Sequence, residues 1–404
     1  MKTVAIIAEY NPFHLGHQYQ IDRVRDILGE DTAIVAVMSG NFTQRGEIAI
    51  ADKTLRARAA VDCGVNLVLE IPFPYSMTSA ENYAMSGVTI ADSLGVVDYL
   101  AFGSECGDLA ALREVALRTE SYEYRAEISR LSDSPEHANL CHPALSSLAY
   151  RNLYGEESEL LSSPNNILAI EYLRALHRLD SDIIPMTVKR EGAGYNDALI
   201  DDERLQSASA IRDKLLSGDI SALDYLPENA KIVYYEAIAS GKLTRASALD
   251  APVISHLRLN PPTYREYHDC AGGLNYRLAD ASLEANTITS LIALAQTKRY
   301  TAARVRRALL SSYFGVTSSD ILTYPKFTQV LAMDPIGASI LKKTKKMTDF
   351  PIITKPSAFT DLGDEVVRQK SISVRADSVF ALCEEKPSSA KHPLTFTPYV
   401  KKAR

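Results

Sequence analysis

The first hundred residues of this chain repeat one pattern, in which short runs rich in β-branched residues alternate with helix-length segments. The apolar runs are nearly continuous, as is typical of strands buried on both faces of a parallel sheet, and they cover residues 3–8, 32–38, 67–71 and 98–102. Between them, residues 15–28 and 53–63 carry apolar side chains at helical spacing. Strand and helix in turn form βαβ units, so the sequence predicts an α/β fold with a doubly wound parallel sheet. Such sheets bind ligands beyond the carboxyl ends of their strands.

The character of the sequence changes after residue 212. One more strand is expected at residues 183–188, but from 212 to about 315 the patterns are helical, for example at 281–296. A chain of 404 residues is long enough for two or three domains. We therefore predict a first domain over residues 1–216 and a mostly α-helical second domain over residues 217–404.

Charge is unevenly distributed along the chain. The whole sequence has 44 basic and 50 acidic residues, and this net charge of −6 argues against sequence-independent binding of nucleic acid. Between residues 296 and 346, however, ten basic residues stand against two acidic ones, so the window carries +8 and the rest of the chain −14. A solvated helix face or an RNA-binding surface would both produce such a window. The candidate RNA-binding side chains are Lys298, Arg299, Arg304 and Arg307, with Tyr300 as a candidate stacking surface.

The sequence lacks the marks of a secreted, membrane or metal-binding protein. Its five cysteines are scattered without a Cys-x-x-Cys pair, which fits a reducing cytoplasm. The apolar run at residues 4–8 ends at Glu9, and no stretch reaches the roughly 18 apolar residues that a membrane-spanning helix needs. We therefore expect a cytoplasmic protein with no membrane contact and no resident metal, and the sequence implies no protein partner.

The most informative residues follow the first predicted strand. His14 and His17 stand three positions apart and flank Gly16, where strand should give way to helix. At the start of a helix, free N–H groups and the positive end of the dipole favour anions, and imidazoles can add hydrogen-bond donors. A glycine leaves room for a base or a phosphate to approach the backbone. The pattern indicates a nucleotide-phosphate site, although capping or core histidines and a metal-binding pair are alternative interpretations.

A second candidate phosphate site is the segment Ser-Ala-Ser-Ala-Ile-Arg at residues 207–212. Two hydroxyls and a guanidinium at a helix start can bind the β- and γ-phosphates of a nucleotide, although Ser207 or Ser209 could instead simply cap the helix. His-x-Gly-His behind the first strand resembles the signature of the nucleotidyltransferase superfamily that includes class I aminoacyl-tRNA synthetases. Ser207, Ser209 and Arg212 fit its second signature, in the same chain order.

Longer segments resemble one family within that superfamily, the bacterial tRNA(Met) cytidine acetate ligases. The resemblance extends over most of the chain. The matching stretches are AEYNPFHLGH at 8–17, MSGNFTQRGE at 38–47 followed by Lys53, NLVLEIPFPY at 66–75, FGSE at 102–105, SPNNILAIEYLRAL at 163–176, VKREGAGYND at 188–197, SASAIR at 207–212 and TKRYTAARVRRALL at 297–310.

The resemblance implies a two-step ligase. ATP and acetate would form acetyl-adenylate with release of pyrophosphate, and the acetyl group would pass to the exocyclic amine of the wobble cytidine of elongator tRNA(Met), giving N4-acetylcytidine. ATP would be bound in residues 1–216 and tRNA in residues 217–404, and Mg²⁺ beside ATP is compatible with this chemistry. The implied ATP contacts are Ile7, Ala8, Glu9, Tyr10, Asn11, Pro12, Phe13, His14, Leu15, Gly16, His17, Gln18, Tyr19, Gln20, Gly103, Asn165 and Arg190, together with Ser207 and Ser209.

The residue types suit this chemistry. Acetate is already a nucleophile and pyrophosphate a good leaving group, so adenylation needs positioning and charge neutralisation rather than a covalent side-chain nucleophile. We hypothesise that His14, His17 and Arg212 are the catalytic residues, through stabilisation of the charge that develops on the phosphates. Two rival hypotheses are a small-molecule adenylyltransferase, which could be complete in one α/β domain, and a non-enzymatic RNA-binding protein, which would not need the two motifs.

Overall fold

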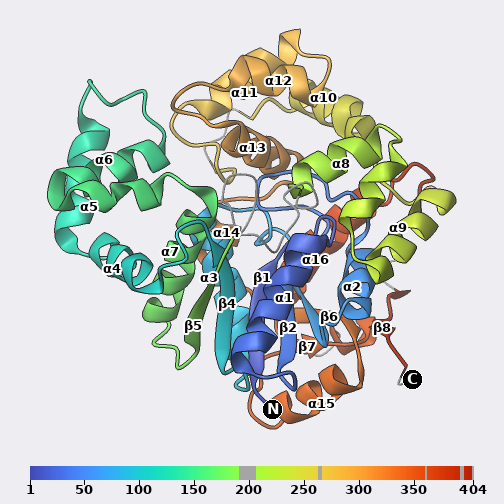
Figure 1. Ribbon diagram of the computed structural model, residues 1–404. Helices are drawn as coiled ribbons and strands as arrows, with labels where there is room; N and C mark the ends of the chain where they lie inside the picture. Colours follow the sequence, from blue (N-terminus) through green and yellow to red (C-terminus); the bar gives the residue numbers. More distant parts are fainter. Residues whose placement is uncertain (191–205, 263–265, 360–361, 392–394, 403–404) are drawn as a thin grey trace.

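The computed structural model describes residues 1–190, 206–262, 266–359, 362–391 and 395–402. Its centre is a sheet with the strand order β5-β4-β1-β2-β3-β6-β7, in which β8 pairs with β6 (Figure 1). The five strands from β5 to β3 are parallel, as expected, whereas β6 is antiparallel to β3. The strands are β1 (Thr3–Ala8), β2 (Ala33–Ser39), β3 (Leu67–Ile71), β4 (Tyr99–Ser104), β5 (Ile184–Lys189), β6 (Thr328–Met333), β7 (Ile352–Ile353) and β8 (Tyr399–Val400).

Both faces of the sheet are covered, because alternate residues of its strands enter two different cores. In β1, Ala5 packs with helices of one face, while Val4 and Ile6 pack with those of the other. The first core includes α3 (Ala80–Ser93), α7 (Pro164–Arg178) and α15 (Pro335–Thr344), and the second includes α1 (Leu15–Leu28), α2 (Lys53–Asp62), α8 (Ala208–Leu216) and α9 (Glu228–Ser240). The prediction of a doubly wound α/β sheet is confirmed.

Two groups of helices extend beyond the carboxyl ends of the strands (Figure 1). One is the α4–α6 arm, which consists of α4 (Leu109–Thr119), α5 (Tyr122–Asp133) and α6 (His142–Tyr154). The other group has a hydrophobic core of its own. It consists of α10 (Asp250–Leu259), α11 (Leu274–Glu284), α12 (Ile288–Ala295) and α13 (Ala302–Phe314). The short α14 (Ser319–Leu322) and α16 (Asp364–Phe380) contribute side chains to the same core. The single helix expected over 281–296 is interrupted between Glu284 and Ile288, where Thr287 caps the start of α12.

The second half of the chain is mostly helical, but it also completes the sheet. Strand β6 lies within the predicted second domain, and Val68 pairs with Ala332 in the antiparallel ladder of β3 and β6. Val330, Leu331 and Ala332 are fully buried, so β6 needs the same two-sided cover as the other strands. Strands β6, β7 and β8, which follow residue 216, therefore belong to the same sheet as the strands that precede it.

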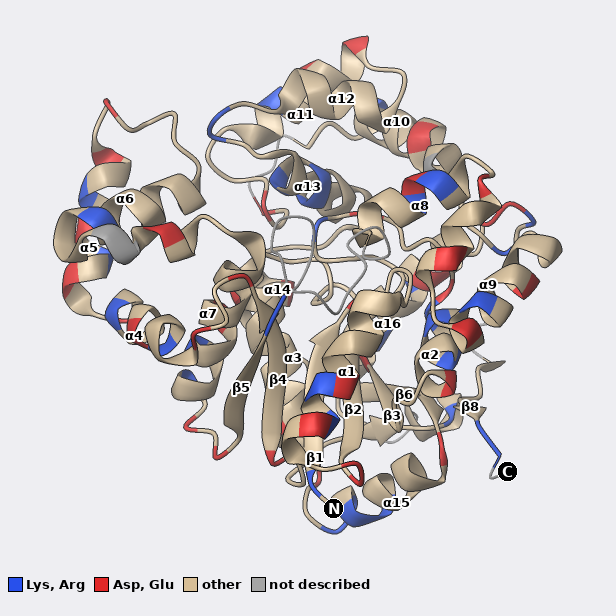
Figure 2. Ribbon diagram, in the orientation of Figure 1, with Lys and Arg blue, Asp and Glu red and all other residues tan. Residues whose placement is uncertain are grey.

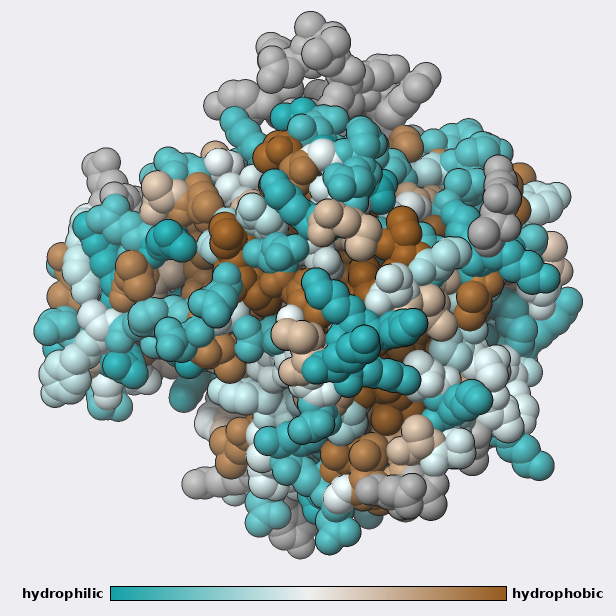
Figure 3. Space-filling view, turned by 90° about the horizontal axis from the view of Figure 1, so that it is seen from below, coloured by the Kyte–Doolittle hydropathy of each residue, from teal (hydrophilic) through white to brown (hydrophobic). Residues whose placement is uncertain are grey.

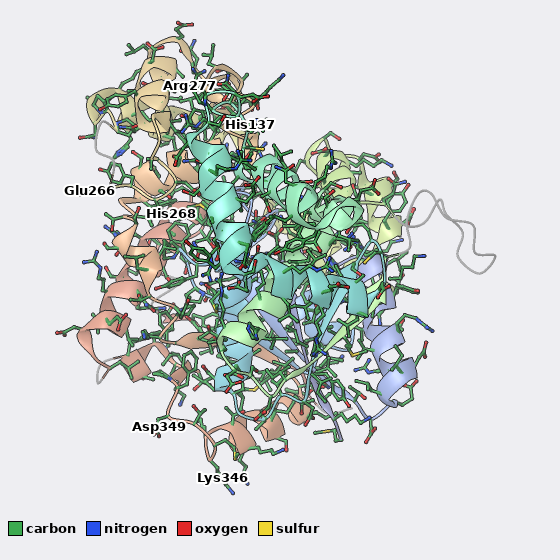
Figure 4. The ribbon with its side chains drawn as sticks, turned by 90° about the vertical axis from the view of Figure 1, so that its left-hand side faces the viewer. His137, Glu266, His268, Arg277, Lys346 and Asp349 are labelled. Atoms are coloured by element: carbon green, nitrogen blue, oxygen red, sulfur yellow. The ribbon has the colours of Figure 1, made fainter. Side chains whose placement is uncertain are left out.

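The basic window of the sequence does not form one surface. Lys298 and Arg299 precede α13, whereas the lysines from Lys342 to Lys346 lie on or just after α15. These two helices lie at opposite ends of the sheet (Figure 2), and Figure 4 shows Lys346 far from Arg277, which belongs to α11 next to α13. The charge of +8 is thus divided between two regions, and only the one at α13 can act with the carboxyl ends of the strands.

None of the helices described by the structure is long and apolar enough to cross a membrane. Seen from the end of the molecule at which α15 lies, hydrophobic residues are interspersed with hydrophilic ones (Figure 3). All five cysteines are free thiols, and Cys63, Cys270 and Cys383 are buried.

Candidate active site

The carboxyl ends of β1, β4 and β5 open into one cleft with a volume of about 970 Å³. Most of the predicted nucleotide-site residues line it: Ile7, Ala8, Glu9, Tyr10, Asn11, His14, His17, Gln20, Gly103, Asn165, Arg190, Ser207, Ser209 and Arg212. They come from the β1–α1 junction, the end of β4, the start of α7, the end of β5 and the start of α8. The structure therefore brings the two predicted phosphate motifs together. The stretch 191–197 of the resemblance lies outside the described residues.

The other members of the predicted ATP segment are not among the residues that line the cleft: Pro12, Phe13, Leu15, Gly16, Gln18 and Tyr19. Phe13 is fully buried beneath the motif, where its ring centroid lies 4.9 Å from that of Tyr10. The structure shows a packing reason for glycine at position 16. A Cβ atom at this position would lie 2.9 Å from Cε1 of His14, so the glycine makes room for the His14 ring.

The side chains of His14 and His17 both cap helix α1, and in each ring Nδ1 is the atom that accepts a backbone N–H. Nδ1 of His14 accepts a hydrogen bond from the Gly16 N–H at 3.0 Å, and Nδ1 of His17 accepts one from the His14 N–H at 3.2 Å. An Nδ1 atom that accepts a hydrogen bond carries no proton, so the proton of each neutral ring is on Nε2. The capping interpretation of the histidines is thus correct, but capping leaves the Nε2–H donor of each ring available for a ligand.

The electrostatic environment keeps both rings neutral. Burial lowers the pKa of His14 to about 3, with a further lowering from Arg190 and Arg212. Burial also lowers the pKa of His17 well below its usual value, and His14 and Arg190 add to the effect. The ring centroids are 3.9 Å apart, so two N–H donors lie side by side at the positive end of the α1 dipole. This arrangement favours an anion without adding a charged imidazolium to the site.

Two guanidinium groups add positive charge to the same cleft. Arg212 donates from Nη1 to the carbonyl oxygen of Asn11 at 2.9 Å and from Nη2 to the hydroxyl of Ser209 at 3.3 Å. The first of these hydrogen bonds joins the 207–212 segment to the loop that precedes His14. Arg190 lies over Gly103, where an added Cβ atom would be 3.1 Å from Cγ of the arginine. Among the described residues, Arg190 forms no ion pair. Its charge is therefore available to an anionic ligand.

Glu47 connects the phosphate motifs to α13, a role for which no sequence pattern provides a signal. Its Oε2 lies 3.1 Å from Nη2 of Arg212, and its Oε1 lies 3.2 Å from Nη1 of Arg306 on α13. One carboxylate thus pairs with a cation from each of the two predicted domains. A phosphate bound at Arg212 would compete with this ion pair.

Asn165 is positioned by a reciprocal contact between the end of β4 and the start of α7. Oε1 of Glu105 accepts from the backbone N–H and from Nδ2 of Asn165, at 3.0 and 2.7 Å. In return, Oδ1 of Asn166 accepts from the backbone N–H of Glu105 at 2.9 Å. Ser207 has a similar local role, because its hydroxyl accepts from the Ala210 N–H at 3.2 Å and caps α8. The alternative helix-cap interpretation of Ser207 is therefore correct.

Arg56, which sequence reasoning missed, holds the loops on which the site is built. Its guanidinium is fully buried and donates only to carbonyl oxygens: to Glu9 at 2.5 Å, to Ser39 at 3.1 Å, to Ala51 from Nε at 3.0 Å and to Gly40. Glu9 and Ser39 stand at the carboxyl ends of β1 and β2. A single side chain thus joins the loop that precedes the histidines to the neighbouring loop.

Replacement of Arg56 by methionine should lower the free energy of unfolding by about 3–5 kcal/mol, because it leaves several buried carbonyl oxygens without a donor. Urea unfolding followed by circular dichroism measures the change. Arg58→Met is the matched control on the same helix, since the Arg58 side chain is 36% exposed and pairs with exposed Glu236. We expect about 1 kcal/mol or less for the control. Equal losses in the two variants would contradict this role of Arg56.

Helix α13 contributes a further wall of the cleft. Of the four predicted RNA-binding residues, Arg299, Arg304 and Arg307 line the cleft, and exposed Lys298 is not among its lining residues. Arg307 is nearly buried and its Nε pairs with Oδ2 of Asp269 at 2.6 Å, so it stabilises the helical lobe. Arg304 donates to the carbonyl oxygens of Asp269 and Ala271. Arg299 and Lys298 remain the exposed cations of the four.

The expectation that Tyr300 offers a stacking surface is wrong. Its side chain is only 6% exposed, and its hydroxyl donates to the carbonyl oxygen of Gly272 at 2.5 Å. The guanidinium carbons of Arg299 and Arg304 lie 5.6 and 5.4 Å from the ring centroid. The ring therefore supports the two arginines and is not accessible to a base.

Comparison with known proteins agrees with this geometry. The model of the HIGH nucleotidyl transferase family matches residues 1–393. The tRNA(Met) cytidine acetate ligase of Acetivibrio thermocellus is 34% identical over 415 residues, which cover 98% of this chain and 99% of that protein. The chain belongs to the tRNA(Met) cytidine acetate ligase family. A second member, from Caldanaerobacter subterraneus subsp. tengcongensis, is 36% identical over 366 residues, or 89% of this chain and 90% of that protein.

The solved structure of Thermotoga maritima TmcAL bound with alpha-thio ATP matches over the full length of both chains. The TM-score is 0.90 at 28% sequence identity. The resemblance predicted from the sequence segments is thus confirmed at the level of family and fold, and it includes the helical second half. His-x-Gly-His at residues 14–17 is the motif of the HIGH nucleotidyl transferases in this chain.

Proposed function

We propose that this protein is an ATP-dependent ligase that forms acetyl-adenylate from acetate and ATP and then acetylates the wobble cytidine of elongator tRNA(Met). The observation that carries the proposal is the cleft itself. Two neutral imidazole donors, the start of α1 and two guanidinium groups converge on it from segments that the family model spans in full. The curated relatives are tRNA(Met) cytidine acetate ligases, and the T. maritima relative was solved with an ATP analogue. A tRNA substrate supports a cytoplasmic location, which is part of the proposal.

The described residues fit the needs of adenylation. When the acetate carboxylate attacks the α-phosphorus, negative charge grows on the phosphate oxygens, and fixed donors that point at this charge lower the barrier. The Nε2–H groups of His14 and His17 can serve as these donors without a change of protonation. Arg212 and Arg190 offset the charge of the phosphates that leave. A magnesium ion, if ATP brings one, would be held chiefly by the phosphates, as is common for this ion.

The second step explains why the cleft extends to the helical half of the chain. The exocyclic amine of cytidine is a weak nucleophile because its lone pair is delocalised into the ring, so acetate must first be activated. The base must also leave the anticodon stack, at modest cost in an unpaired loop. Lys298 and Arg299 are placed to bind the phosphate backbone of that loop beside the cleft. A small-molecule adenylyltransferase would have no use for this second wall.

The proposal is tested by exchange of labelled pyrophosphate into ATP. We expect exchange that depends on acetate and that proceeds without tRNA, followed by formation of N4-acetylcytidine when elongator tRNA(Met) is added. Mass spectrometry of nucleosides from the digested tRNA detects this product. If exchange of pyrophosphate into ATP required an acceptor other than acetate, a small-molecule adenylyltransferase would be favoured. Absence of exchange together with tight tRNA binding would favour a non-enzymatic RNA-binding protein.

A further inference from the structure

We propose that Glu9 is the general base of the acetyl-transfer step and removes the proton from the exocyclic amine of the cytidine as that amine attacks the acetyl carbon. The inference rests on the proposed function and assigns a residue to its second half-reaction. Glu9 stands directly after β1 and lines the cleft, five residues before His14. The carboxyl group therefore lies on the same loop as the groups that would hold the adenylate.

The carboxyl group of Glu9 is held in place but keeps one oxygen available. Its Oε1 accepts the backbone N–H of Gln44 at 2.9 Å. Within the described part of the chain, Oε2 accepts no hydrogen bond. The backbone of the same residue is fixed by Arg56, which donates to the Glu9 carbonyl oxygen at 2.5 Å. One oxygen thus orients the group and the other can accept a proton.

The loop that orients Glu9 also reaches the helical half. Gln44 and Glu47 belong to the connection between β2 and α2, and Glu47 pairs with Arg306 on α13. A cytidine of an RNA that is bound along α13 would arrive at this loop. Glu9 therefore lies where an adenylate bound at the histidines and an amine brought by the RNA would meet.

The other acidic side chains of the cleft are already engaged. Four carboxylates besides Glu9 line it in the described residues, and each pairs with arginine: Glu47 with Arg212 and Arg306, Glu81 with Arg178, Glu171 with Arg174, and Asp269 with Arg307. His14 and His17 cannot take the proton either, because Nδ1 of each accepts a backbone N–H and Nε2 carries the proton. Among the described carboxylates that line the cleft, Glu9 is the one that forms no ion pair, and it stands beside the histidines.

The surroundings make this carboxylate a stronger base than an exposed one. Burial raises the pKa of Glu9 above its usual value, while the Gln44 N–H and the Arg212 charge act in the opposite direction. A higher pKa increases the driving force for proton transfer from the amine. The charges of Arg212 and Arg56 favour the ionised form, which is the form that accepts a proton.

The step balances as follows. The N4–carbon bond forms and the bond between the acetyl carbon and the adenylate oxygen breaks, so AMP leaves with the electron pair of that bond. The proton lost by the amine passes to Oε2 of Glu9 and from there to solvent. No oxidant, reductant or further substrate is required.

Glu9→Gln tests the proposal, because the amide oxygen can still accept the Gln44 N–H while the side chain loses its basicity. We expect acetyl transfer to tRNA, measured in a single turnover, to fall by on the order of 10²–10⁴-fold. Acetate-dependent pyrophosphate exchange should fall by a much smaller factor than acetyl transfer, and acetyl-adenylate should accumulate in the presence of tRNA. Glu9→Asp, which retains a carboxylate, should recover part of the transfer rate.

Glu120→Gln is the matched control. Glu120 is a partly buried carboxylate at the end of α4 that pairs with Arg174 and Arg178, and its replacement should alter neither half-reaction. Unchanged acetyl transfer in Glu9→Gln would overturn the proposal. Parallel losses of exchange and transfer would also overturn it and would place Glu9 in adenylation instead. Failure of the proposed function is distinguishable, because the wild-type protein would then show no acetate-dependent exchange.

Discussion

Replacement of His17 by asparagine should slow acetate-dependent pyrophosphate exchange by on the order of 10²–10³-fold, the usual cost of one lost donor at a developing negative charge. The asparagine oxygen falls near the position of Nδ1, so it can still accept the His14 N–H that lies 3.2 Å from this atom. The variant therefore preserves the start of α1 and loses only the donor at Nε2. Initial rates of exchange at saturating acetate measure the effect, and thermal unfolding confirms that the fold is retained.

His17→Gln is the complementary variant. Its amide nitrogen falls near the position of Nε2 and can still donate, but the acceptor for the His14 N–H is lost. We expect this variant to retain more exchange activity than His17→Asn and to lose about 1 kcal/mol of stability, as is usual for a removed helix cap. If His17→Asn exchanged at the wild-type rate, or if it were the more active of the two, the donor role of His17 would be wrong.

Charge reversal at Lys298 and Arg299 together should weaken the binding of elongator tRNA(Met) by on the order of 10–100-fold at low salt. Both side chains are exposed, whereas Arg307 pairs with Asp269 inside the lobe, so reversal there would also disturb the fold. The dissociation constant measured over a salt series should show a slope reduced by about 0.7–0.9 for each lost phosphate contact. Pyrophosphate exchange, which involves no tRNA, should continue in this variant.

Charge reversal at Lys345 and Lys346 together is the control from the same basic window of the sequence. It makes the same change of charge just after α15, at the other end of the sheet, where Figure 4 labels Lys346. The affinity for tRNA should stay within about twofold of the wild-type value. An equal loss in this control would mean that net charge, not a site at α13, controls binding. An unchanged affinity and salt slope in the Lys298 and Arg299 double variant would rule out the site itself.

The sequence was sufficient for those parts of the molecule in which a local pattern decides the structure. Strand β1 and helix α1 begin and end where the apolar runs predicted, because β-branched runs and helical spacing are local signals. The placement of His14, His17 and Arg212 in one cleft also followed from general rules, since parallel strands bring their carboxyl ends to one edge. These rules identify a region of the molecule, but they do not give hydrogen-bond partners.

Long-range pairings were the part that the sequence could not provide. Arg56 looks like any arginine of a surface helix, and only the fold places it among carbonyl oxygens from two loops. Glu47 has no local signal either, because its partners Arg212 and Arg306 are distant in the chain. The basic window was misleading for the opposite reason: residues close in sequence lie on α13 and α15, which the fold separates.

The antiparallel pairing of β6 with β3 has a consequence for how the chain folds as it leaves the ribosome. Strand β3 ends at Ile71, but its partner begins only at Thr328. At about 5–20 residues per second, synthesis leaves the outer edge of β3 without that partner for on the order of ten seconds or more. An exposed strand edge pairs readily with other chains, so the nascent protein is most prone to aggregation in this interval. A fragment that stops before β6 would retain this weakness permanently.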